Sequence, residues 1–275
     1  MPPPSPRPAP TRARPAAAPA PWRLLVTPPA GGAENMALDE ALMSRARDDG
    51  AAILRVYAWR EPTLSLGRNQ TARGRYDLRA AAARGVRFVR RPTGGRALLH
   101  HHEITYSVTA PERLLGALGE SYARINRLLV GALARLGVPA TVAAAAGPAP
   151  RPGIAPCFAE PVAGEIVAGG RKLVGSAQWR DRGALLQHGA ILVEDDQPLA
   201  SALLREPAAP PPAPATLRAL LGRAPRAEEV AAAMAAALEA SEGSAPRVME
   251  VDDALGAAAR ALTGRYLSEE WTWRR

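Results

Sequence analysis

The alternation of apolar and polar residues predicts helices in the first half of the chain, in its middle and at its C-terminal end. In these stretches apolar side chains recur every three or four residues, which places them on one face of a helix. A glycine follows several of the stretches and favours the end of a helix there. The predicted helices span residues 34–47, 77–84, 121–136, 226–240 and a last amphipathic stretch capped by Asp252 and Asp253.

Shorter runs of the sequence predict strands over residues 53–59, 63–66, 86–90 and 103–109. The strongest strand signal lies within residues 164–194, where three runs are separated by a Gly-Gly pair and by Asp-Arg-Gly. Glycine supplies the positive φ that tight turns require, so an antiparallel meander is expected here. The irregular order of strands and helices indicates an α+β fold rather than a regular βαβ repeat.

Composition divides the chain into parts. Residues 1–33 carry four arginines and no carboxylate, in a Pro/Ala-rich composition that disfavours order, and residues 1–21 are taken as a disordered tail. Residues 22–204 carry the mixed strand and helix pattern. Residues 205–215 are a Pro-rich connector, and residues 216–275 a helical C-terminal segment.

The 275 residues carry a net charge of +9, and without the tail arginines the charge is still +5. A basic chain favours acidic partners, but aromatic residues are only 4% and no zinc or helix-turn-helix spacing occurs, which argues against nucleic acid. No apolar run reaches the roughly 20 residues of a membrane span, and no secretory signal is visible. We therefore expect a cytoplasmic protein that binds no membrane.

Lysine and cysteine each occur once, as Lys172 and Cys157, whereas 34 of the 35 basic residues are arginine. A lysine kept in an arginine-rich chain indicates a position where a compact ammonium is needed, although chance retention is the simpler alternative. Cys157 lies in a loop rich in Pro and Gly, where a bulky substrate can reach a thiol. The alternative is a small buried apolar residue.

Two further segments contain candidate binding residues. Residues 90–97 (RRPTGGRA) combine a tight turn with arginines. This combination is typical of an anion-binding turn, and the alternative is an ordinary hairpin with solvated arginines. The spacing of its glycines fits neither a Walker loop nor a Rossmann fingerprint. Small residues on the strand after Lys172 leave room for an extended ligand. The candidates in these segments are Arg91, Thr93, Gly94, Gly95, Arg96, Gly175, Ser176, Ala177 and His188.

Three consecutive histidines, His100 to His102, precede Glu103. Consecutive residues of an extended segment alternate in direction, so at most two of the three side chains point the same way, and no cysteine or second histidine pair lies at ligand spacing. We therefore expect no metal. Either His101 or His102 is a candidate for substrate binding and proton transfer, and the alternative is that these imidazoles are solvated or satisfied by other groups.

Taken together, the motifs resemble the biotin/lipoate protein ligase superfamily, in its lipoate-protein ligase A and octanoyltransferase branch. The matching segments occur in a fixed order between residues 35 and 194: ENMALDEAL, LSLGRNQ, RRPTGGRALLHHHEITYS, the Cys-Phe loop and GRKLVGSAQWR with LLQHGAI. The resemblance implies a mixed β-sheet flanked by helices, with residues 22–204 as the catalytic domain and a small helical C-terminal part. It also implies an acyl tunnel beside the RRPTGGR turn.

The branch contains two chemistries. Ligases activate free lipoate with ATP and Mg²⁺, whereas octanoyltransferases take octanoate from acyl carrier protein through a cysteine thioester and need no cofactor. Cys157 matches the catalytic cysteine of the Gram-positive-type octanoyltransferases, although Glu160 to Gly164 departs from the residues that usually follow it. The segment after residue 215 is short for the extra domain of the ligases.

The resemblance therefore implies transfer of an octanoyl or lipoyl group from acyl carrier protein, through Cys157, to a lysine of a lipoyl domain such as the glycine cleavage H protein or an E2 subunit. Lys172 is expected to stabilise the oxyanion of each tetrahedral step. Three alternatives remain: an ATP-dependent ligase, an amidotransferase that moves lipoyl groups between proteins, and a module that binds acyl chains or lipoyl domains without catalysis.

Overall fold

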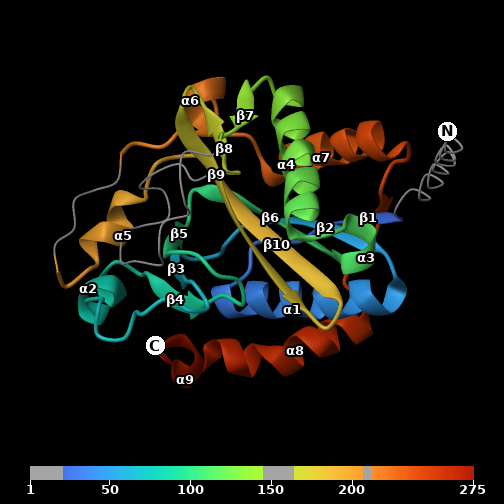
Figure 1. Ribbon diagram of the computed structural model, residues 1–275. Helices are drawn as coiled ribbons and strands as arrows, with labels where there is room; N and C mark the ends of the chain where they lie inside the picture. Colours follow the sequence, from blue (N-terminus) through green and yellow to red (C-terminus); the bar gives the residue numbers. More distant parts are fainter. Residues whose placement is uncertain (1–20, 145–163, 207–211) are drawn as a thin grey trace, which may run out of the picture.

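The computed structural model describes residues 21–144, 164–206 and 212–275. The strands of its main sheet are β1 (Trp22–Val26), β2 (Ala52–Tyr57), β6 (Glu103–Pro111), β7 (Ala140–Val142), β8 (Ile166–Ala168), β9 (Arg171–Asp181), β10 (Ala184–Leu192) and β11 (Arg247–Val248). They lie in the order β11-β1-β2-β6-β10-β9-β8-β7 (Figure 1). The sheet is mixed, because β1 runs parallel to both β2 and β11 while the other neighbours are antiparallel.

The helices cover both faces of this sheet. They are α1 (Gly32–Asp49), α2 (Leu78–Ala83), α3 (Glu112–Leu115), α4 (Leu118–Arg135), α5 (Pro198–Ala202), α6 (Leu217–Leu221), α7 (Ala227–Glu242), α8 (Asp253–Leu267) and α9 (Glu269–Thr272). Helices α1 and α8 pack together on one face, and α4 and α7 on the other (Figure 1). All nine residues of both β6 and β10 are buried as a result, as expected for strands covered on two sides.

A second sheet of three strands adjoins the first. Its strands are β3 (Thr63–Leu66), β4 (Arg87–Arg90) and β5 (Leu98–His100), in the order β4-β3-β5. Residues 53–59 and 63–66, expected as two strands joined by a short turn, therefore belong to different sheets. The small sheet has its own apolar core with α2 and α5, which includes Leu64, Leu66, Leu99 and Leu203.

The predicted fold class is confirmed: the fold is α+β, with a mixed sheet between helices and a helical C-terminal segment. The expected antiparallel meander over residues 164–194 is β8, β9 and β10. All five predicted helices are present, and the Asp252 carboxylate accepts a hydrogen bond from the Leu255 N–H at the start of α8. In the described part of the chain, no helix has the combination of length and apolar character that crossing a bilayer requires.

The expectation that residues 1–33 would not order was wrong for residues 22–33. Strand β1 pairs with β2 over five residues, and α1 already begins at Gly32. Trp22 and Leu25 of β1 are buried on opposite faces of the strand, where they join two different apolar clusters. A segment with a Pro/Ala-rich average composition thus still provides apolar side chains to both faces of the sheet. Strands β5, β7 and β11 were also missed, since two or three residues carry no periodic signal.

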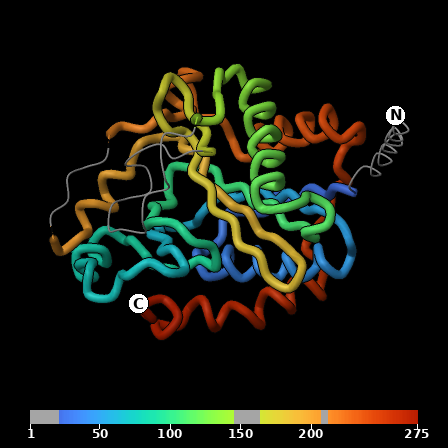
Figure 2. Tube along the Cα trace, in the orientation of Figure 1, coloured from blue at the N-terminus to red at the C-terminus, as the bar shows by residue number. Residues whose placement is uncertain are grey.

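The C-terminal segment returns along α1 towards the small sheet (Figure 2). Helix α9 contacts β4, and the Trp273 ring lies 5.1 Å from the Phe88 ring, centroid to centroid. The last residue is held by the loop after β3, because the Arg275 carbonyl accepts hydrogen bonds from the N–H groups of Ala72 and Arg73. Strand β1, near the start of the described residues, and the C-terminal segment thus both contribute to the packing around the sheets.

Candidate active site

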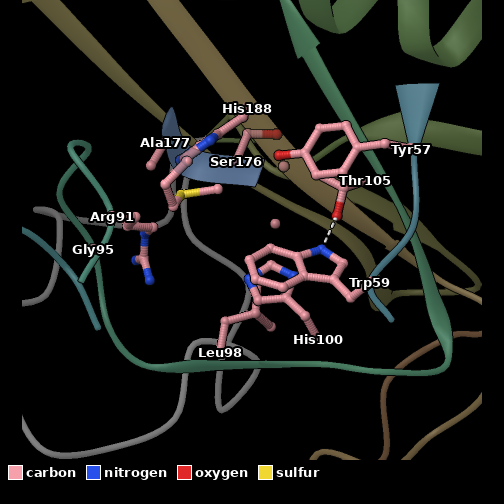
Figure 3. A pocket seen from close by; sticks show the side chains of 13 residues that line it. Tyr57, Trp59, Arg91, Gly95, Leu98, His100, Thr105, Ser176, Ala177 and His188 are labelled. Atoms are coloured by element: carbon pink, nitrogen blue, oxygen red, sulfur yellow. Dashed lines mark hydrogen bonds between the residues drawn. The ribbon is translucent and has the colours of Figure 1, made fainter. Parts of the chain in front are cut away.

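A cavity lies where the main sheet, the small sheet and helix α1 meet. It encloses about 420 Å³ of empty space, including the solvent at its mouth. It is lined by Met36, Tyr57, Trp59, Arg91, Gly95, Leu98, His100, Thr105, Gly175, Ser176, Ala177, His188 and Gly189 (Figure 3).

Large rings and apolar side chains make up the floor of the cavity. The Trp59 indole stacks on the His100 imidazole, with ring centroids 3.9 Å apart, and its Nε1–H donates to Thr105 Oγ1 at 2.8 Å (Figure 3). Met36 and Leu98 add apolar surface and are buried. Because the indole N–H is already hydrogen-bonded, the floor presents mainly apolar surface, which suits a hydrocarbon chain.

The cavity opens beside the RRPTGGR turn and strand β9. Among its lining residues, Gly95 is exposed, Ser176 and Ala177 are half-buried, and the others are buried. Side chains alternate along β9, so Gly175 and Ala177 face one side and Ser176 the other, where its hydroxyl lies 2.6 Å from the Tyr106 hydroxyl. The three small residues therefore do not all face the same way.

Close backbone packing and a positive φ explain the glycines at the rim of the cavity. A Cβ on Gly189 would lie 2.4 Å from the Gly175 carbonyl oxygen, and Gly95 adopts φ +91°, a conformation that favours glycine. Gly67, on the neighbouring loop, approaches the turn still more closely, since its Cβ would lie 1.9 Å from the Gly95 oxygen. These positions keep strand, turn and loop in contact at the rim of the cavity.

The arginines of the turn are mainly used to hold backbone. The Arg91 guanidinium donates to the carbonyl oxygens of Ser65, Gly94 and Arg96, and thereby folds the turn around itself. Arg90 is fully buried and donates to the carbonyls of Gly67, Gln70 and Thr272. Arg96 is half-buried, and Gly94 has an open position with no neighbour within 4 Å of a Cβ.

A chain of buried polar groups supports the inner wall. Thr93 Oγ1 lies 2.7 Å from His188 Nε2, and His188 Nδ1 lies 3.1 Å from Asp39 Oδ2. Asp39 also accepts hydrogen bonds from the Tyr57 hydroxyl and from Arg55, each at 2.8 Å. Burial alone would raise the pKa of Asp39, but the His188 hydrogen bond and the Arg55 charge outweigh it and lower the pKa below 3.8. Asp39 thus fixes the orientation of the His188 ring.

His100 and Glu103 form a second buried pair under the cavity. His100 Nδ1 lies 3.0 Å from Glu103 Oε1, and His100 Nε2 lies 2.8 Å from Ser65 Oγ. Burial, followed by the Arg91 charge, lowers the pKa of His100 well below 6.5, and burial raises the pKa of Glu103 well above 4.5. Both shifts favour the uncharged form of the group, so burial disfavours net charge at this wall of the cavity.

His101 and His102 lie outside the cavity. Their side chains are 37% and 47% exposed, and each Nδ1 lies within 3.5 Å of Asp196 Oδ2. One ligand atom from each of these three residues lies within 4.8 Å of the others. The structure therefore places His100 at the cavity rather than the two histidines that the sequence favoured, because the chain bends directly after β5.

Lys172 is buried near the start of β9, and its Nζ lies 2.5 Å from Glu165 Oε1. It is not one of the residues that line the cavity. By the alternation of the strand it shares a face with Val174 and Ser176, whereas Ala177 lies on the other face. Cys157 lies outside the described residues, so its placement relative to Lys172 stays a prediction.

The structure thus brings Arg91, Gly95, Gly175, Ser176, Ala177 and His188 together, with Thr93 directly behind His188. Sequence reasoning missed Asp39, Tyr57, Trp59 and His100 as part of the site. Asp39 had a signal that was available, since a carboxylate among the apolar positions of the first helix is unusual unless it is paired. The aromatic residues carried none, because a tryptophan in a strand is as common in an ordinary core.

Three comparisons place this geometry in context. The family described as the lipoyl protein ligase A/B catalytic domain matches residues 32–239. An octanoyltransferase LipM from Kyrpidia tusciae is 40% identical over 271 residues, 92% of this chain and 99% of the relative. Another from Symbiobacterium thermophilum is 45% identical over 192 residues, 68% of this chain and 70% of the relative.

A solved structure has the same architecture. The protein Ta0514 from T. acidophilum with bound lipoic acid matches with a TM-score of 0.75 and 25% identity, over 92% of this chain and 99% of that one. The cavity and the RRPTGGR turn fall inside the range matched by the family. Because that match spans most of the sequence and a relative is 40% identical over nearly its full length, the chain belongs to the lipoyl protein ligase A/B catalytic domain family.

Proposed function

We propose that this protein is an octanoyltransferase that carries the octanoyl group as a thioester on Cys157 and passes it to a lysine of a lipoyl domain. The observation that carries the proposal is the apolar cavity beside the RRPTGGR turn, in a chain that is 40–45% identical to octanoyltransferases. The acyl chain lies along Trp59 and Leu98, and its carboxyl end faces the rim at Gly95 and Ala177.

The wall of the cavity supports an uncharged alkyl chain as ligand. The Trp59 ring stacks on His100 and its indole N–H is hydrogen-bonded to Thr105, while burial favours the uncharged forms of His100 and Glu103. An ionised substrate tail would lose its hydration in such a place without gaining a partner. A medium-length hydrocarbon chain has no charged group to desolvate there, and its burial contributes about 0.8 kcal/mol of binding free energy for each methylene group.

The transfer takes place in two steps. In the first, the Cys157 thiolate attacks the carbonyl carbon of the octanoyl thioester, the bond to the donor sulfur breaks, and the donor leaves as a thiol after taking up a proton. In the second, the neutral lysine amine of the acceptor attacks the acyl-cysteine carbonyl. The amide forms, the amine loses a proton and the Cys157 thiolate leaves. Two large protein partners can therefore visit in turn.

Lys172 supplies the charge that each step needs. Its ammonium donates a hydrogen bond to the oxygen on which negative charge grows, and a well-placed donor of this kind contributes about 3 kcal/mol. Two facts support this role: Lys172 is the sole lysine of the sequence, and its side chain is 1% exposed. Lys172 Nζ donates a hydrogen bond to Glu165 Oε1 at 2.5 Å, which holds the side chain in position.

The donor is octanoyl-acyl carrier protein, and the acceptor is a lipoyl domain of a glycine cleavage H protein or an E2 subunit, in the cytoplasm. The net charge of +9 supports acidic protein partners, whose approach a basic surface accelerates. The reaction needs no ATP, Mg²⁺ or other cofactor, because the donor thioester already carries the activated acyl group. An ATP-dependent ligase and a non-catalytic binding module are outcomes of the test below.

Intact-mass spectrometry after incubation with octanoyl-carrier tests the proposal. The wild-type protein is expected to gain about 126 Da, the mass of an octanoyl group replacing a thiol proton, and to lose it when a lipoyl domain is added. Cys157→Ala abolishes the adduct and the transfer, whereas Ser244→Ala, at an exposed position that does not line the cavity, changes neither. Full activity of Cys157→Ala with free lipoate and ATP would establish a ligase, and absence of any product would establish a binding module.

A further inference from the structure

Two arginines beside the rim of the cavity have no acidic partner among the residues that the structure describes. Arg68 follows β3 and Arg274 follows α9, and both are half-buried. In the described part of the chain no carboxylate lies within 4.0 Å of either guanidinium, although thirteen other arginines are ion-paired there. Burial, followed by the charges of Arg68 and Arg275, lowers the pKa of Arg274. These cations are thus packed together against their mutual repulsion.

The fold holds this pair in place. Arg274 Nη2 donates to the Arg68 carbonyl oxygen at 2.6 Å, which ties the C-terminal segment to the loop after β3. The Trp271 indole N–H donates to the Arg90 carbonyl at 2.8 Å, and Arg90 Nε donates to the Thr272 carbonyl at 2.9 Å. Hydrogen bonds in both directions therefore position the last residues of the chain and the Arg274 guanidinium next to the loop that carries Arg68.

Each guanidinium lies over an indole ring. The Arg68 guanidinium carbon is 5.0 Å from the centroid of Trp179, and that of Arg274 is 4.1 Å from the centroid of Trp271. A guanidinium that stacks on a ring still directs its N–H groups outward in its own plane, where they can bind the two oxygens of a phosphate. The face of the ring covers one side of the cation and reduces its hydration, which strengthens such a contact.

The pair lies next to the mouth of the cavity. The Arg68 N–H donates to the Thr93 carbonyl at 2.8 Å, and Thr93 belongs to the turn that forms one side of the rim. Trp179, under the Arg68 guanidinium, is two residues beyond Ala177 on the same face of β9, and Ala177 forms the other side. An anionic group attached to a ligand in the cavity therefore meets these arginines as it leaves the rim.

We propose that Arg68 and Arg274 form a binding site for the phosphate of the acyl-phosphopantetheine arm that delivers the octanoyl group. This inference rests on the proposed function. The arm joins the thioester sulfur to a phosphate through a flexible uncharged linker. When the acyl chain occupies the cavity, the phosphate lies outside the rim, beside two guanidiniums that no carboxylate of residues 21–144, 164–206 or 212–275 pairs with. The site makes the donor's prosthetic arm, rather than its protein surface, the recognised feature.

The first experiment compares two small donors, octanoyl-phosphopantetheine and octanoyl-pantetheine, which differ only in the phosphate. For the wild-type protein, kcat/KM of acyl-enzyme formation is expected to be about tenfold or more higher with the phosphorylated donor. Arg68→Gln and Arg274→Gln are expected to remove this preference while leaving octanoyl-pantetheine unaffected. Arg182→Gln, at the exposed tip of the β9–β10 turn, removes the same charge and keeps the preference.

The proposal is overturned by a wild-type protein that does not distinguish the two donors, or by variants that slow both equally. It is also overturned if the variants slow only octanoyl-carrier protein, because the arginines then contact the protein surface. Calorimetric binding of phosphopantetheine without an acyl group separates this site from the chemistry. A Kd raised about tenfold in both variants supports the site even where no acyl-enzyme forms, an outcome that would refute the proposed function alone. Equal Kd values in all three proteins refute the site.

Discussion

Replacement of Asp39 by asparagine removes the one negative charge from the buried network behind the cavity. Its carboxylate accepts hydrogen bonds from Arg55, Tyr57, Ser107 and His188, with distances of 2.8 to 3.1 Å, and it is fully buried. Asparagine offers one acceptor oxygen and turns an NH₂ group towards two of these donors. Arg55, which is 1% exposed, then keeps a buried charge without its counter-charge.

The expected cost follows from this geometry. Removing one partner of a buried ion pair costs about 3–5 kcal/mol, because the remaining charge has lost both water and counter-ion. For a domain of this size that corresponds to a fall in Tm of about 6–20 °C. The double variant Asp39→Asn with Arg55→Met removes both charges, so it is expected to recover part of the loss and to show a coupling of about 0.5–3 kcal/mol.

Denaturant unfolding at pH 7, with thermal unfolding as a second readout, measures these differences. Asp48→Asn is the matched control, since Asp48 lies on the same helix with its side chain 69% exposed, and it should unfold like the wild type. The lowered pKa of Asp39 also sets the direction of the pH dependence. The stability that its carboxylate contributes is present above pH 3.8 and is lost as pH falls through the lower pKa of the folded state. A loss below about 1 kcal/mol for Asp39→Asn would refute the view that the network is held together by this charge.

Three further predictions concern the site. Lys172→Met should lower the rate of octanoyl transfer by about 10²–10³-fold while the protein stays folded. Arg171→Gln, at the exposed neighbouring position, should leave the rate unchanged. Near-normal transfer by Lys172→Met would exclude the ammonium as the donor to the oxyanion. Gly67→Ala should lower Tm and disrupt the turn, because the added Cβ would collide with the Gly95 carbonyl oxygen. Gly94→Ala is the control, since a Cβ there has no neighbour within 4 Å and Tm should stay the same. Similar Tm values for both variants would contradict the close packing at Gly67. Burial raises the pKa of Glu103, so its protonated form contributes stability that is present below pH 4.5 and is lost as pH rises through the pKa of the folded state. Glu103→Gln keeps the acceptor oxygen for Thr105, so this loss of stability with rising pH should become smaller when unfolding is measured across pH. An unchanged pH dependence of the unfolding free energy would argue against a protonated Glu103.

Local patterns were sufficient for the long elements. Helices α1, α4 and α7 have 16 to 18 residues each, so each spans four or more turns, and in α4 the apolar residues are clearly concentrated on one face. Gly169, Gly170 and Gly183 mark the turns of the β8–β9–β10 meander, and all three adopt positive φ in the structure. The ordered series of short motifs was also sufficient to indicate the family, which the comparisons confirmed.

What the sequence could not determine is how these elements meet. Asp39, Thr93 and His188 are separated by up to 149 residues, and the hydrogen bonds that connect them exist only once α1 packs on β10. The same applies to His100, which the sequence could not distinguish from its two neighbours. A bend after β5 directs one histidine under Trp59 and leaves the other two beside Asp196.

The sequence by itself determined the elements and the chemical groups that the chain has available, including a single cysteine, a single lysine and the RRPTGGR turn. Only the tertiary structure decided that Arg90 and Arg91 hold backbone while Arg68 and Arg274 stack on Trp179 and Trp271. The reason is physical: periodicity and turn preference depend on neighbours along the chain, whereas burial, pKa and ion pairing depend on groups brought together by long-range packing, and these decide what each side chain does.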